Sequence, residues 1–90
     1  MLLITHKKGN GRCLAFLISE RIYDCRDIHP GLPETEEAFL AEWEKYKSLA
    51  QLMHNALQTN SIKRELEHIE IGAAEDVQAV VLPGVQADKI

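Results

Sequence analysis

The chain is poor in several features that mark specialised proteins. Its 90 residues hold two cysteines, five glycines and three prolines, with no internal repeat and no low-complexity tract. The two cysteines can form at most one disulfide, and no secretory signal accompanies them, so reduced thiols are expected. The apolar start, MLLI, is followed closely by His6, Lys7 and Lys8, which makes it too short for a signal peptide or a membrane span. We therefore expect a cytoplasmic protein without membrane attachment.

Positive charge is also scarce. Ten Lys and Arg residues stand against 14 Asp and Glu residues, and the formal net charge is −4. Only residues 1–33 have a positive balance, with a net charge of +2. A protein that binds nucleic acid has to neutralise several phosphates with a concentrated basic surface. Direct nucleic-acid binding is therefore not expected; it would have to use Lys7, Lys8 and Arg12, and it would weaken steeply with salt.

The remaining composition is that of a folded domain. Apolar residues make up 46% of the chain and charged residues 27%, which argues against disorder over most of its length. A chain of 90 residues has room for a single core. We predict one domain over residues 1–84 and a C-terminal tail over residues 85–90.

The strongest periodic signal runs from Glu34 to Asn60 and predicts one long amphipathic helix. Pro33 suits a first helical turn, and the glutamates that follow it favour the positive end of the helix dipole. Asn60 can cap the C-terminus of the helix. Apolar side chains recur along this segment at steps of three and four. The stripe consists of Phe39, Trp43, Tyr46, Leu49, Ala50, Met53, Ala56 and Leu57.

Two apolar runs before this helix predict strands over residues 2–6 and 12–18. Asn10 and Gly11 between them can supply the positive φ angles of a tight turn, so the two runs are expected to form a β-hairpin. The run 12–18 is apolar on both alternating faces, which predicts an interior strand covered by the helix. Residues 20–28 fit a third strand, although a bend in one long strand fits nearly as well, because no glycine or proline precedes them.

The segment after the helix has mixed signals. Residues 61–71 fit a helical turn that passes into a strand over residues 68–71. Residues 72–76 have the composition of a turn. The β-branched run 77–82 predicts a strand that Pro83 ends.

These elements predict a small α+β fold. An antiparallel sheet of three to five strands packs on one long amphipathic helix, and the order along the chain is ββ(β)αβ(β). The alternative is a mainly helical bundle in which residues 12–26 are also helical.

Only one group of residues offers nucleophile or metal-ligand chemistry. Cys25 and His29 have a spacing that zinc can use, and Cys13 is the remaining thiol. The paired short spacings of a zinc finger are absent, and a nucleophilic cysteine needs a base and an oxyanion site that the sequence does not reveal. We therefore expect no cofactor. A small enzyme or metal-binding protein that uses Cys13, Cys25 and His29 is the alternative function.

Carboxylates gather toward the C-terminal end, where five fall within twelve residues. Such a surface can bind a basic partner and compete with nucleic acid for it. Because the chain lacks a reactive constellation, the leading hypothesis is a non-catalytic protein that binds another macromolecule, as a regulator or inhibitor. The predicted partner-binding residues are Glu65, Glu67, Glu70, Glu75 and Asp76.

The apolar stripe also predicts self-association. It is wider than one small sheet covers, and Leu40 and Leu52 lie at its margins. Surplus apolar surface of this kind is often buried in a homodimer, either between helices or along an edge strand such as residues 77–82.

Overall fold

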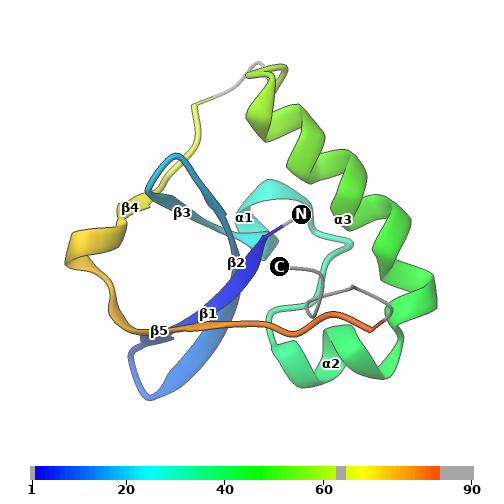
Figure 1. Cartoon of the computed structure of the whole chain (residues 1–90), viewed down its shortest axis with the longest axis horizontal. Helices are drawn as coiled ribbons and strands as arrows, with labels where there is room; N and C mark the ends of the chain where they lie inside the picture. Colours follow the sequence, from blue (N-terminus) through cyan, green and yellow to red (C-terminus); the bar gives the residue numbers. More distant parts are fainter. Residues whose placement is uncertain (1, 63–64, 84–90) are drawn as a thin grey trace.

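Within residues 2–62 and 65–83, which the computed structural model describes, the chain forms five β-strands, three α-helices and one 3-10 turn (Figure 1). In chain order these are β1 (Leu3–Lys8), β2 (Gly11–Ile18), β3 (Arg21–Asp24), α1 (Cys25–Ile28), α2 (Glu36–Ala41), α3 (Trp43–Gln58), β4 (Ile69–Glu70), η1 (Ile71–Ala73) and β5 (Glu75–Ala79). All strand pairs are antiparallel, in the order β4-β3-β2-β1-β5. The predicted α+β fold is confirmed, and β2 is the central strand, as its two-sided apolarity indicated.

The sheet is curled. Its edge strands, β4 and β5, are joined by only four residues, 71–74. Four strand spacings in a flat sheet span roughly 19 Å, whereas five residue steps with a 3-10 turn among them reach roughly 13 Å. The short link therefore draws the two edges toward each other. An apolar cluster from all five strands fills the inside of the curl, and it consists of Ile4, Ala15, Leu17, Ile22, Ile69, Ala74 and Val77.

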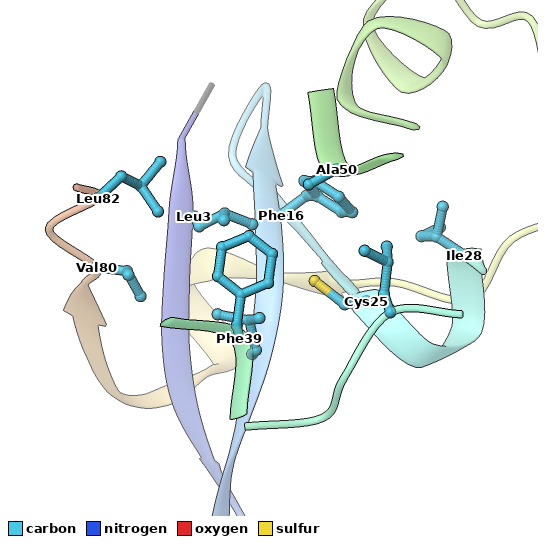
Figure 2. Close-up of a cluster of buried hydrophobic side chains, with 10 residues drawn as sticks. Leu3, Phe16, Cys25, Ile28, Phe39, Ala50, Val80 and Leu82 are labelled. Carbon is cyan, nitrogen blue, oxygen red and sulfur yellow. The ribbon is translucent and has the colours of Figure 1, made fainter. Parts of the chain in front are cut away.

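The main core lies between the other face of the sheet and the helices. Figure 2 shows Leu3 and Phe16 of the sheet facing side chains from all three helices. Each helix contributes at least one residue that is buried from solvent. The helix residues in this cluster are Cys25 and Ile28 of α1, Phe39 of α2 and Ala50 of α3.

The helix predicted over residues 34–60 is not continuous, because it is broken at Glu42. The backbone there has φ −127° and ψ 44°, outside the helical region. Glutamate is a good helix former, so local propensity does not cause the break. We attribute it to packing, since α2 and α3 bury Phe39 and Ala50 in the same core from different directions. The helix also starts later than predicted, at Glu36, and it is capped by Thr35, whose hydroxyl accepts a hydrogen bond of 3.1 Å from the Ala38 N–H.

α3 ends at Gln58, close to the Asn60 that was predicted to cap the helix. Asn60 has φ +56°, the Ser61 N–H donates to the Ala56 carbonyl at 2.8 Å, and the Asn60 N–H donates to Leu57 at 3.2 Å. These bonds form the Schellman motif that an Asn in the left-handed conformation allows. No helix within the described residues is long and apolar enough to cross a membrane.

Most of the apolar stripe packs inside the molecule. Phe39 and Ala50 are fully buried, and the larger stripe residues on α3 are partly buried against the main core. Leu52, at the margin, is 60% exposed. Much of the apolar surface on which the dimer prediction rests is therefore covered by the chain's own sheet.

The segment after α3 is more extended than predicted. Residues 61–62 and 65–68 contain no helical turn, while the predicted strand is present as β4. The predicted turn over residues 72–76 is η1, which begins at Ile71. The predicted strand 77–82 is present as β5, but it starts two residues earlier, at Glu75, and ends three residues earlier, at Ala79, before Pro83 is reached. The predicted tail over residues 85–90 lies outside the described residues.

The β1–β2 hairpin is confirmed, but its turn differs from the prediction. Lys8 pairs with Gly11, so the loop consists of Gly9 and Asn10. Gly9 has φ +63°, whereas Asn10 is not in the positive region. A positive φ at the first loop residue alone is the pattern of a type II′ turn, which favours glycine there.

A second tight turn separates β2 from β3, so the bend considered for residues 20–28 is wrong. Ile18 pairs with Arg21, and the loop residues Ser19 and Glu20 have φ +51° and +66°. Two positive values are the pattern of a type I′ turn, which favours Asn-Gly. The third strand is also shorter than predicted, because α1 begins at Cys25.

We expect the double substitution Ser19→Asn with Glu20→Gly to stabilise the protein by about 1 kcal/mol. The left-handed conformation costs an ordinary L-residue roughly 1–2 kcal/mol, and glycine avoids this cost while losing more chain entropy on folding. Urea denaturation should show a higher midpoint. The control is Ser19→Asn with Glu20→Ala, which removes the same charge but keeps a Cβ; equal stability of the two variants would contradict the assignment.

Candidate functional site

A charged network joins β1 to the end of β3. Nε2 of His6, whose side chain is 1% exposed, lies 2.7 Å from Asp24 Oδ1. The Lys8 ammonium donates to Asp24 Oδ2 at 2.5 Å. The register of β1, β2 and β3 explains why the side chains of His6 and Asp24 come into contact. On the intervening β2, the small residues Cys13 and Ala15 stand opposite His6 and Asp24, respectively, so the larger side chains can meet over them.

The network holds Asp24 in its ionised form. Burial acts to raise the pKa of Asp24, but the hydrogen bonds from Lys8 and His6 and the positive charge of Lys8 outweigh it, so this pKa lies below its ordinary value. The bond to Asp24 raises the pKa of Lys8. Nδ1 of His6 is buried without a hydrogen-bond partner among the described residues. The carboxylate therefore places the imidazole proton on Nε2, where it can be donated.

A hollow of about 250 Å³ lies beside the network. Its walls carry charges of both signs, and they are formed by Lys8, Cys13, Leu14, Asp24, Arg26, Asp27 and Glu34. Both cations already have partners, since Lys8 pairs with Asp24 and Arg26 pairs with Glu34 at 3.0 Å. The hollow is therefore a poor site for a phosphate or another anion.

The residues of the alternative function do not come together. Cys25 is buried on the helix side of the sheet, and burial raises the pKa of its thiol. Cys13 lies opposite His6 on the concave side, and burial raises its pKa as well. Thiols with raised pKa values are weak nucleophiles. Nδ1 of His29 accepts a bond of 2.9 Å from the Gly31 N–H, and the described residues contain no group of three His, Cys, Asp or Glu side chains that could hold a metal.

The structure divides the five predicted partner-binding residues between the two edges of the sheet, and all five are exposed. Glu65 and Glu67 precede β4 and line a hollow of about 270 Å³ with Leu66 and Asp27, which we call the acidic hollow. Within the described residues, no ion pair involves Glu65 or Glu67. Asp27 was not predicted as part of this surface, because nothing local to it shows that α1 brings it to the later segment.

The other three predicted residues have cationic neighbours. Glu70 lies 3.4 Å from Nε of Arg21 and 3.2 Å from Nε2 of His68. Glu75 and Asp76 belong to β5, at the other edge of the sheet, where Asp76 pairs with Arg12.

Arg12 holds β5 against β1. Its Nη2 donates to the Thr5 hydroxyl at 2.9 Å and to the Thr5 carbonyl at 3.2 Å, and its Nη1 donates to the Asp76 carboxylate. Nη2 also donates to the Asp76 carbonyl. Asp76 has φ +52° and lies where the β1–β5 register shifts between Thr5 and Lys7, so it forms a β-bulge. Two of the three cations considered for nucleic-acid binding, Arg12 and Lys8, therefore already pair with carboxylates.

Comparison of the chain with protein-family models, with curated proteins and with solved structures found no match.

Proposed function

We propose that this is a non-catalytic protein that binds a basic segment of another macromolecule at the acidic hollow. The observation that carries the proposal is the placement of Glu65 and Glu67, which are exposed beside Asp27 without an ion pair to any described residue. The cations Lys8, Arg12 and Arg26 each form an ion pair with another carboxylate, and of these three only Lys8 lines a hollow together with Asp27 and Glu67. Lysine or arginine side chains of a partner supply the complementary charge.

A regulator or inhibitor fits this surface. A protein that occupies the basic surface of its partner prevents nucleic acid from binding there, because both ligands use the same cations. The net charge of −4 also favours approach to a basic partner and speeds the encounter at low salt.

Neutralising Glu65 and Glu67 tests the proposal. The probe is an acetylated peptide of alternating lysine and valine, and its affinity is measured by fluorescence anisotropy at low and at physiological salt. We expect Glu65→Gln with Glu67→Gln to weaken binding roughly tenfold, because two exposed ion pairs contribute up to about 1 kcal/mol each. The binding of the unmodified protein should also weaken as salt increases.

The matched control is Glu42→Gln with Glu44→Gln on α3, which changes the net charge equally at a distance from the hollow. Glu42 and Glu44 make only exposed pairs with Lys45 and Lys47. This variant should bind the peptide almost as well as the unmodified protein. Equal weakening in both variants would show that net charge alone drives binding and would overturn the proposed site.

A further inference from the structure

β4 is an edge strand, and its outer side has no neighbouring strand within residues 2–62 and 65–83. Glu70 is opposite Arg21 in the β3–β4 ladder, and the next residue, Ile71, donates its N–H to the Glu20 carbonyl at 2.9 Å. Successive residues of an antiparallel strand direct their N–H and C=O groups to opposite sides. The Ile71 N–H faces β3, so the Glu70 C=O, on the opposite side of the same peptide plane, faces outward. The alternation along β4 places the Glu70 N–H on the same outer side.

The opposite edge is less suited to pairing. β5 carries the bulge at Asp76, where the backbone is in the left-handed conformation and Arg12 holds both the carboxylate and the carbonyl. A bulge interrupts the regular row of donors and acceptors that an added strand needs. The edge of β4 is short but contains no bulge, and the residues 65–68 that precede it form no helix or turn.

Charge identifies the kind of strand that fits β4. Glu65, Glu67 and Glu70 are exposed along this edge, and Glu70 has Arg21 and His68 as neighbours. A second copy of the chain, related by a twofold axis, would bring these carboxylates against their own equivalents, and such like charges repel. A strand that carries lysine or arginine would find opposite charges.

We infer that the basic segment of the partner binds as an added antiparallel β-strand along β4. This inference rests on the proposed function and specifies how the partner is recognised. One residue of the partner exchanges two hydrogen bonds with Glu70, through the outward N–H and C=O. The side chain of that residue lies on the same face as the Glu70 side chain, so a lysine or arginine at this position forms a cross-strand ion pair.

The substitution Glu70→Pro distinguishes strand addition from simple charge attraction. Glu70 has φ −67°, which matches the fixed φ of proline, and its N–H takes no part in the β3–β4 ladder. Glu70→Pro therefore removes the outward donor while the sheet is kept. Glu70→Gln is the control, because it removes the same charge and keeps the donor. The lysine–valine peptide should bind Glu70→Pro at least about fivefold more weakly than Glu70→Gln.

Amide hydrogen exchange gives a second measurement on the unmodified protein. The Glu70 amide should exchange rapidly in the free protein and become protected when the peptide is bound, whereas the Ile71 amide, which bonds to Glu20, should be protected in both states. This measurement does not depend on the folding of a variant.

The outcomes separate the two proposals. If neutralising Glu65 and Glu67 weakens binding but Glu70→Pro binds as well as Glu70→Gln and the Glu70 amide stays unprotected, strand addition is overturned and the proposed function stands. If the unmodified protein does not bind the peptide, both are overturned. If light scattering gives twice the chain mass and the Glu70 amide is protected without peptide, a second copy occupies the edge and the inference fails.

Discussion

Replacing Asp24 by alanine is expected to lower the free energy of unfolding by about 3 kcal/mol at neutral pH. The substitution leaves Nε2–H of His6 without an acceptor, and this ring is 1% exposed. A buried donor without a partner costs roughly 1–3 kcal/mol, and a hydrogen bond to a charged group contributes roughly 1.5–3 kcal/mol. Lys8, with a side chain that is 54% exposed, can be solvated by water and adds little. Equilibrium denaturation in urea measures the loss.

The variant Asp24→Asn separates the hydrogen bond to His6 from the charge of the carboxylate. Its amide oxygen can still accept the bond from His6, so we expect a smaller loss than for alanine, about half. The asparagine variant lacks the carboxylate charge but has nearly the same shape. If both variants were as stable as the unmodified protein, the network would contribute nothing to folding.

The same network predicts a pH dependence. The pKa of Asp24 is lower in the folded protein than the ordinary value of an aspartate, so the folded state binds its proton less readily than the unfolded chain does. The stabilisation is therefore complete above the unfolded value and is lost as pH falls through the lower, folded value. Between neutral pH and about pH 3, the stability difference between the unmodified protein and Asp24→Asn should shrink. A constant difference across that range would contradict the low pKa.

The second large effect is expected for Arg12→Ala, which should destabilise the protein by about 2 kcal/mol through its bonds to Thr5. The Thr5 hydroxyl and carbonyl accept from the guanidinium, and Thr5 is 4% exposed. Hydrogen bonds to a charged group contribute roughly 1.5–3 kcal/mol. Without Arg12 the bulge at Asp76 also loses its tether, so the amides of β5 should exchange faster than those of β2.

Two further variants define what Arg12 does. Arg12→Lys keeps the charge but cannot bond Thr5 and Asp76 together through a planar guanidinium, so it should recover only a small part of the stability. Arg21→Ala removes the same charge from an exposed ion pair with Glu70 and should cost less than about 1 kcal/mol. If Arg12→Lys were fully stable, charge rather than geometry would hold β5.

Local chemistry was sufficient to predict the central strand and the long helical segment. The two-sided apolarity of residues 12–18 identified the strand, the spacing of the stripe identified the helical segment, and Asn60 marked the end of α3. Each of these signals depends on neighbours within a few residues, because strand and helix periodicities are local properties of the chain. The turn at Ser19 and Glu20 was missed since neither residue favours the positive φ that the turn imposes on both.

The candidate site was decided by tertiary structure. Arg12 meets Asp76 across 64 positions of sequence, and His6 meets Asp24 across 18. Whether such residues touch depends on strand register and on the curl of the sheet, and a shift of one residue would turn each side chain to the other face. The sequence by itself determined that carboxylates are plentiful after the helix. The fold decided that Glu65 and Glu67 lie beside Asp27 while Asp76 is held by Arg12 at the other edge, because the chain passes from β4 to β5 between opposite sides of the sheet.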